Sequence, residues 1–184
     1  MMRYEQRLKK IIANDDMFVS VLKAVESLHL PDAWVCAGYL RNKIWDVQDN
    51  ISTTVNDIDV IYFDEVTIST DIERKLELLL QEIMPGQPWS VKNQARMHEK
   101  NGSNPYHSSF EGVSNFPETP TAVAIRIRNN ELAVMAPYGL SDLFCKYVRP
   151  TPNFDKTSDL YSVYLERVNQ KKWDERWSHL IVER

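Results

Sequence analysis

Apolar positions in the first part of the chain recur with the spacing of a helix. Tyr4, Leu8, Ile11 and Ile12 lie three, four or one position apart, which places them on one face of a helix with 3.6 residues per turn. A second series of the same kind begins after the polar run "NDD". It consists of Met17, Val21, Leu22, Val25 and Leu28. We therefore expect two N-terminal helices within residues 1–30.

Strand-length and helix-length patterns alternate after these helices. Pro31 ends the second helix, and "AWVCAG" (33–38) is apolar up to its closing glycine. A helical period resumes in "YLRNKIWDVQ" (39–48). A polar loop leads to the apolar run "DIDVIYF" (57–63), and "STDIERKLELLLQEI" (69–83) is again helical. This order predicts an α+β or α/β fold, with a small mixed sheet flanked by helices.

The second half of the chain continues the pattern of strands and short helices. Residues 89–98 predict a strand that runs into a short helix, and 123–134 predict a hairpin. The segment 99–121 is rich in Asn, Ser, Gly and Pro, and its length indicates an ordered functional loop or a mobile lid. A helical C-terminal segment is expected at about 156–177. No linker or repeat interrupts 1–184, so we expect a single domain.

Composition narrows the classes of function. With 43% apolar and 26% charged residues, the 184-residue chain has the composition of a folded protein. The formal net charge of -4 argues against strong binding to duplex nucleic acid or to an anionic membrane. Cys36 and Cys145 lack zinc-binding spacing and are expected to be reduced core residues. Without a signal peptide or a long apolar run, we expect a cytoplasmic protein with no membrane span.

Two acids at the start of a predicted strand are the main candidates for functional-site residues. In "VNDIDVIYFD", Asp57 and Asp59 are two positions apart, so a strand would point both side chains to one face with Cα atoms about 6.6 Å apart. At about 4 Å two ionised carboxylates would repel by something like 4 kcal/mol at an effective dielectric of 20. A divalent cation relieves this repulsion, and oxygen ligands favour Mg²⁺ or Mn²⁺. Asp57 and Asp59 are therefore candidate metal ligands.

Gly38 and Arg41 supply the features of an anion site upstream of the acids. Gly38 stands between an apolar strand and a helix, and Arg41 is in the first turn of that helix. Backbone N–H groups at a helix start attract anions because of the helix dipole, and glycine leaves room for a phosphate. Together with the acid pair, this indicates a phosphoryl-transfer or nucleotidyl-transfer site.

These residues resemble the nucleotidyltransferase superfamily that includes DNA polymerase β and the CCA-adding and poly(A) polymerases. The similar run is "AGYLRNKIWDVQDNISTTVNDIDVIYFD" (37–64), with Ala37-Gly38 at the small-residue turn and Asp57-Ile58-Asp59 as the acidic pair. A wider pattern over most of 30–177, including "WSVKNQARMH", "FPETPTAVAIRI", "APYGLSDLF" and "VRP", is similar to a family of uncharacterised bacterial nucleotidyltransferase-like proteins. The resemblance implies the palm-like fold of polymerase β.

The resemblance also implies a reaction. Asp57 and Asp59 would hold Mg²⁺ or Mn²⁺ and be catalytic, while Gly38 and the following amides would bind the triphosphate of an NTP. Arg41 would contact either phosphate or the acidic strand. A nucleoside monophosphate would pass to an unknown acceptor (a small molecule, an RNA end or a protein) and pyrophosphate would leave.

The sequence departs from the superfamily pattern in its acids. Many members carry a third carboxylate on a neighbouring strand, and here Asn93 and Gln94 stand where we would expect it. Glu118 and Asp142 are alternatives without a geometric argument. The turn at Ala37-Gly38 also has a single glycine, whereas members of the superfamily usually have Gly-Gly or Gly-Ser there.

Several interpretations stay open at this stage. Lys92 and Arg96 are candidate nucleotide-binding residues at the end of a strand, and a solvated basic edge explains them equally well. An inactive nucleotide-binding or regulatory module on the same fold is the alternative to an active transferase. A metal-dependent phosphohydrolase or nuclease would use the same acids, but the overall charge does not favour a long nucleic-acid substrate.

Overall fold

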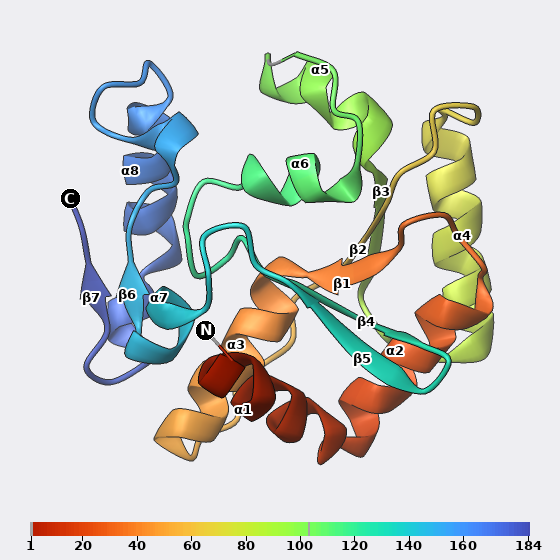
Figure 1. Ribbon diagram of the computed structural model, residues 1–184, viewed down its shortest axis with the longest axis horizontal. Helices are drawn as coiled ribbons and strands as arrows, with labels where there is room; N and C mark the ends of the chain where they lie inside the picture. Colours follow the sequence, from red (N-terminus) through yellow and green to blue (C-terminus); the bar gives the residue numbers. More distant parts are fainter. Residues whose placement is uncertain (1, 103) are drawn as a thin grey trace.

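A five-stranded mixed sheet forms the centre of the protein in the computed structural model, which describes residues 2–102 and 104–184 (Figure 1). The strand order is β3-β2-β1-β4-β5. β2 and β3 pair in parallel, and the remaining neighbours pair antiparallel. The strands are β1 (Trp34–Cys36), β2 (Ile58–Tyr62), β3 (Trp89–Asn93), β4 (Ala124–Arg128) and β5 (Glu131–Met135).

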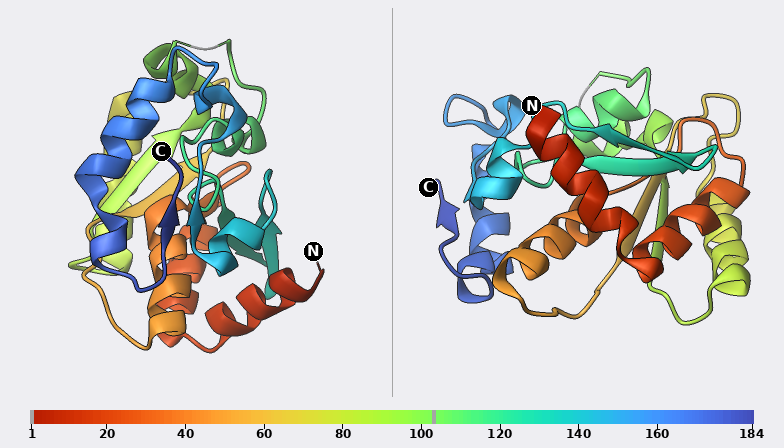
Figure 2. Two further views of the ribbon diagram at one scale, coloured as in Figure 1. Left: turned by 90° about the vertical axis from the view of Figure 1, so that its left-hand side faces the viewer. Right: turned by 60° about the horizontal axis from the view of Figure 1, so that its bottom comes forward.

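Four helices cover one face of this sheet. They are α1 (Met2–Ala13), α2 (Asp16–Ser27), α3 (Ala37–Asp49) and α4 (Thr70–Ile83). Their apolar stripes pack on Val35, Val60 and Val91, which point to this face from three neighbouring strands and are fully buried. The right-hand view of Figure 2 brings α1 and α2 in front of the strands. We call this side the closed face.

The opposite face carries a smaller apolar cluster. Trp34 and Cys36 of β1 meet Ile61 of β2 and Val113 of the short helix α6 (Ser109–Ser114). The 3₁₀ turn η1 (Gln94–Arg96) and α5 (Met97–Asn101) follow β3 on this side. Because these elements are short, they cover the face only in part. We call this side the open face.

The C-terminal part packs beside the sheet rather than entering it. α8 (Tyr161–Lys171) lies on the same side of the molecule as the turn from β1 into α3 (Figure 1). The neighbouring elements are α7 (Ser141–Cys145), β6 (Tyr147–Val148), η2 (Pro152–Phe154), η3 (Trp173–Glu175) and β7 (Ile181–Val182), in which β6 and β7 pair in parallel. Trp177 fixes this part to α3, because its Nε1 donates to Asp46 Oδ1 at 2.7 Å and its ring packs edge-on against Trp45.

The structure confirms the α+β fold and most of the predicted elements, with two corrections. The C-terminal helix is shorter than the expected 156–177 and ends at Lys171, because Lys172 adopts a left-handed conformation with φ 48°. Cys145 is exposed, so the expectation that it is a core residue was wrong. It lies at the end of α7, where its neighbour Phe144 takes the buried position. The segment 99–121 contains α6.

Within the described residues, no helix is both long enough and apolar enough to cross a membrane.

Candidate functional site

A cavity of about 410 Å³ opens between the start of α3, the start of β2 and the C-terminal helix α8. We call it the polar chamber. Its lining includes both residues of the acid pair and five basic side chains. These residues are Asp57, Asp59, Arg41, Lys92, Arg167, Lys171 and Arg176. The concentration of cations around two carboxylates is what a polyanionic ligand requires.

The acid pair owes its position to the alternation of side chains along β2. Ile58 and Val60 point to the closed face, so Asp59 points to the open face, as does Asp57 just before the strand. Burial and, to a lesser degree, the negative charge of Asp57 together raise the pKa of Asp59 to about 6, while a hydrogen bond with Ser90 on β3 opposes the increase. The charged form of Asp59 is therefore held at a cost in free energy when no cation is near.

Asp57 faces the start of α3. A Cβ atom built on Gly38 would lie 3.9 Å from Asp57 Oδ1 and 3.7 Å from Arg41 Nη2. Cys36 at the N-cap position gives no side-chain hydrogen bond to this helix, so side-chain capping does not compete with a ligand for its first amides. The turn is tight, because Ala37 has φ 56° and donates its N–H to Val123 O at 3.1 Å.

Arg41 is buried at the bottom of the polar chamber. Its Nη1 donates to Thr121 Oγ1 at 2.7 Å and its Nη2 to Asn42 Oδ1 at 2.8 Å. The guanidinium lies 4.5 Å from the ring centroid of Trp173, a cation–π distance. Burial lowers the pKa of Arg41 to about 10, and the charge of Glu118 opposes this decrease. The residue therefore remains a cation at neutral pH and is fixed in one orientation.

A second arginine reaches the chamber from α8. Arg167 Nε donates to Glu118 Oε1 at 2.7 Å, and Glu118 is completely buried. Burial alone would lower the pKa of Arg167, but the charge of Glu118 and this hydrogen bond raise it overall. Glu118 and Thr121 lie in one short segment, so this segment positions both Arg41 and Arg167.

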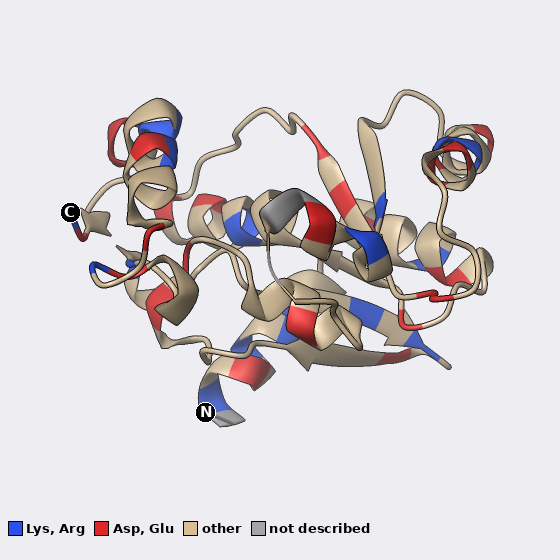
Figure 3. Ribbon diagram, turned by 90° about the horizontal axis from the view of Figure 1, so that it is seen from above, with Lys and Arg blue, Asp and Glu red and all other residues tan. Residues whose placement is uncertain are grey.

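Sequence analysis did not identify the basic residues at the C-terminal end of the chain. Arg167, Lys171 and Arg176 all line the polar chamber. In Figure 3 the basic residues of α8 are blue and the acids of β2 are red. A charged side chain on an amphipathic helix usually belongs to a solvated face, so no local signal distinguishes these residues. Arg167 is distinguished from the solvated basic residues of α8 only by its tertiary contact with Glu118.

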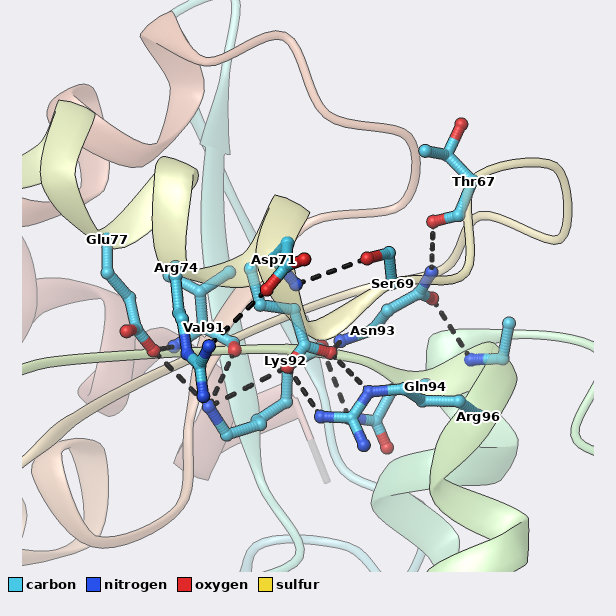
Figure 4. A network of polar contacts seen from close by, with 12 residues as sticks. Thr67, Ser69, Asp71, Arg74, Glu77, Val91, Lys92, Asn93, Gln94 and Arg96 are labelled. Atoms are coloured by element: carbon cyan, nitrogen blue, oxygen red, sulfur yellow. Dashed lines mark hydrogen bonds and ion pairs between the residues drawn. The ribbon is translucent and has the colours of Figure 1, made fainter.

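The two predicted basic residues of the β3 region have different surroundings. Lys92 lines the polar chamber, but its Nζ also lies 3.3 Å from Glu77 Oε1 and 2.9 Å from Val91 O. Arg96 is not among the lining residues, and its Nε donates to the buried Glu73 at 2.7 Å (Figure 4). The structure thus brings Gly38, Arg41, Asp57, Asp59 and Lys92 together and places Arg96 in a separate ion pair.

Comparison with known proteins identifies the family of this chain. A family model described as "Nucleotidyltransferase" matches residues 23–182. The chain belongs to this nucleotidyltransferase family. It is also similar to a solved structure described as "a CCA-adding enzyme head domain", with 34% identity and a TM-score of 0.85 over 97% of this chain and 95% of that chain.

More distant nucleotidyltransferases share the fold. The Thermotoga maritima CCA-adding enzyme complexed with tRNA is 14% identical with a TM-score of 0.59, and a CCA-adding enzyme in complex with ATP is 12% identical with a TM-score of 0.59. Each match covers 96% of this chain and 42% of the enzyme. A search of curated protein sequences found no match.

Among the described residues that line the polar chamber, two are acids. The strand register places Ser90 beside Asp59, whereas the Asn93 side chain binds the backbone of Asp64. Glu118 is paired with Arg167, and Asp142 accepts from Thr119 at 2.6 Å. Within the described part of the chain, no three His, Cys, Asp or Glu residues gather in a group that could hold a metal ion.

A second cavity of about 460 Å³ adjoins the polar chamber. We call it the apolar chamber. Asp59, Lys92 and Arg167 border both cavities, whereas Asp57 lines only the polar one. The side chains that line the apolar chamber alone include Ile61, Phe116, Phe154, Leu160 and Val163. The candidate site is therefore a two-part cleft, and Asp59 lies on the border between the two parts.

Proposed function

We propose that this protein is a metal-dependent nucleotidyltransferase that moves a nucleoside monophosphate from an NTP to an acceptor hydroxyl and releases pyrophosphate. The observation that supports this most directly is the polar chamber, where Asp57 faces Gly38 at the start of α3 and five basic side chains line the same cavity. Membership of the nucleotidyltransferase family and the fold shared with an ATP-bound enzyme agree with it.

The triphosphate is assigned to the basic part of the chamber. The amides that follow Ala37 in the first turn of α3 receive no side-chain cap and can donate to phosphate oxygens, and the helix dipole adds to the attraction. Arg41 is already oriented by Thr121 and Asn42, and Arg167 is oriented by Glu118. Donors fixed before the ligand arrives stabilise developing negative charge without reorganisation.

The donor set of the acid pair fits a divalent cation. Asp57 and Asp59 offer hard carboxylate oxygens, and the raised pKa of Asp59 reflects burial and then the charge of Asp57, both of which a cation would offset. Mg²⁺ commonly takes one or two carboxylates and completes its shell with water and substrate phosphates, so two acids suffice. When bound, Mg²⁺ or Mn²⁺ would polarise the α-phosphate and lower the pKa of the acceptor hydroxyl.

In the proposed step, the oxygen of the acceptor hydroxyl forms a bond to the α-phosphorus. The bond between the α-phosphorus and the oxygen that bridges to the β-phosphate breaks, and pyrophosphate leaves with that electron pair. The proton of the hydroxyl passes to water. The role of Arg41, Arg167 and the α3 amides is to hold the leaving pyrophosphate and its charge.

The test is a titration with ATP in the presence of Mn²⁺, together with an assay for pyrophosphate. We expect the wild-type protein to bind the complex and the double variant Asp57→Asn, Asp59→Asn to bind it at least tenfold more weakly. Asp71→Asn is the matched control, because Asp71 is an exposed acid on α4 outside the polar chamber. Equal binding by the wild-type protein and the double variant would refute the proposal.

A nucleotide-binding module without catalysis is the second candidate. The observation that favours it is the pair of acids, without a third, among the described residues of the polar chamber. It predicts binding of ATP with Mn²⁺ that depends on Asp57 and Asp59 but yields no pyrophosphate with any acceptor. Turnover that is lost in Asp59→Asn would exclude it.

A further inference from the structure

The apolar chamber has the composition of a small-molecule site. Phe116, Phe154, Leu160 and Val163 line it, and its neutral polar side chains are those of Gln94, Asn115 and Thr121. Its volume of about 460 Å³ lies in the usual range of pockets for compact ligands, which are mostly apolar with a few polar groups that fix orientation. The polar chamber is lined by seven charged side chains, so the two cavities suit different parts of a reaction complex.

The stereochemistry of nucleotidyl transfer places the acceptor and the leaving pyrophosphate in different cavities. In an in-line displacement the attacking and leaving oxygens lie on opposite sides of the phosphorus. If pyrophosphate occupies the side of Gly38 and Arg41, the acceptor oxygen must approach the α-phosphate from the side away from them. Gly38 and Arg41 line the polar chamber and not the apolar one, whereas Asp59 lines both, so the apolar chamber joins the acid pair at Asp59.

We propose that the apolar chamber is the acceptor site and that the acceptor is a compact, ring-bearing molecule with a hydroxyl group. This inference rests on the proposed function, because it uses the direction in which pyrophosphate leaves. The ring packs between Phe116 and the α8 side chains, and the hydroxyl reaches the α-phosphate beside Asp59. The bonds that form and break are those of the proposed step.

The charges at the chamber narrow the class of acceptor. Asp59 is the acid among the described residues that line it, and Lys92 and Arg167 are its basic residues. An acceptor with several positive charges would meet two cations and find one carboxylate, which a metal would already neutralise. The site therefore favours an uncharged or anionic acceptor. Its apolar walls also lack the basic track that a nucleic-acid strand needs.

Val163 offers a way to close the chamber without damage to the core. It lies on α8 one turn before Arg167 and is 41% exposed, so a larger side chain can extend into the cavity. Val163→Trp is the blocking variant. Asn169→Trp is the matched control, because Asn169 is an exposed residue of the same helix that lines neither chamber.

The probe is 2-naphthol, an uncharged ring compound with a hydroxyl group, whose binding is followed by ligand-observed NMR in the presence and absence of ATP with Mg²⁺. We expect saturable binding to the wild-type protein that ATP does not displace, at least a tenfold loss in Val163→Trp, and no loss in Asn169→Trp. The affinity of Val163→Trp for ATP should stay within twofold of the wild-type value.

Two results would overturn the assignment. If 2-naphthol does not bind saturably, the chamber is not a site for this class of compound. If ATP displaces it and Val163→Trp weakens ATP binding, the chamber holds the nucleobase of the NTP. Failure of the proposed function is a separate outcome, because it is seen as absent binding of ATP to the wild-type protein, whatever 2-naphthol does.

Discussion

The two faces of the five-stranded sheet differ in kind, although the same strands supply both. On the closed face, Val35, Val60 and Val91 lie in a row across β1, β2 and β3 and are covered by helices. On the open face, the corresponding row is Cys36, Asp59 and Ser90, and a cleft lies over it. One face stabilises the fold, and the other holds two charges that repel.

The two faces also differ in how far along the sequence their contacting segments lie from the strands. The helices of the closed face come from neighbouring parts of the sequence, and each carries its own apolar stripe. The open face receives its partners from distant segments: Thr121 binds Arg41, and Glu118 binds Arg167. A site assembled from distant parts can change its ligands without changing the core that supports it.

The largest effect is expected on the closed face. Leu80 of α4 is fully buried in the main core, so Leu80→Ala removes packed atoms and leaves a cavity, with an expected loss of about 3 kcal/mol of unfolding free energy. Leu79 is 45% exposed, and Leu79→Ala should change stability by less than about 0.5 kcal/mol. Urea denaturation measures both, and equal losses would contradict the division between the faces.

The closed face is also the part that sequence reasoning predicted well. Helical periods from Tyr4 to Leu28 and alternation in β2 are local patterns, and burial follows from them except at Met17, which is 53% exposed. The sequence-based predictions were wrong where a single backbone conformation sets the end of a helix or where a tertiary contact decides which side chain is buried. Lys172 adopts φ 48° and ends α8 early, and Phe144 rather than Cys145 turns inward. Neither event changes the local apolar pattern, so neither could be read from it.

The open face was predictable only where its residues are close in sequence. Gly38, Arg41 and the acid pair belong to one strand–helix–strand segment, and the structure brings them together. Arg167 and Lys171 reach the chamber through the packing of α8, and Arg176 through the turn η3 that follows it; no local pattern encodes this packing. The strand register likewise decides that Ser90, and not Asn93, lies beside Asp59. Register depends on how β3 pairs, not on its composition.

An intermediate effect is expected from the ion pair that supports the open face. Glu118 is fully buried and Arg167 is its partner. Glu118→Gln leaves the guanidinium without its counter-charge, so we expect a loss of about 2 kcal/mol of stability and at least a fivefold weaker affinity for ATP. In the control, Asp174→Asn disrupts the exposed pair with Arg184 and should cost less than about 0.5 kcal/mol. Unchanged ATP affinity in Glu118→Gln would show that Arg167 does not depend on this carboxylate.

A smaller effect of opposite sign is expected at the acid pair. Asp59 is more buried than Asp57, and its charged form is disfavoured by burial and by the charge of Asp57. Without divalent cations at pH 7.5, Asp59→Asn should therefore raise the unfolding free energy by about 1 kcal/mol, while Asp57→Asn raises it less. Thermal unfolding in EDTA makes the comparison. A destabilised Asp59→Asn would mean that the carboxylate contributes to the fold as well as to the site.

The smallest effect is expected at the turn that joins the two faces. Ala37 has φ 56° between β1 and α3, and a left-handed conformation costs a residue with a Cβ roughly 1–2 kcal/mol. Glycine avoids this strain but loses more backbone entropy on folding, so Ala37→Gly should gain only about 0.5 kcal/mol. Ala13→Gly, at the exposed end of α1, should lose stability instead. If urea denaturation shows a loss in Ala37→Gly as well, contacts of the Ala37 methyl group outweigh the strain, and the turn is held by the packing of that methyl group on the apolar cluster of the open face.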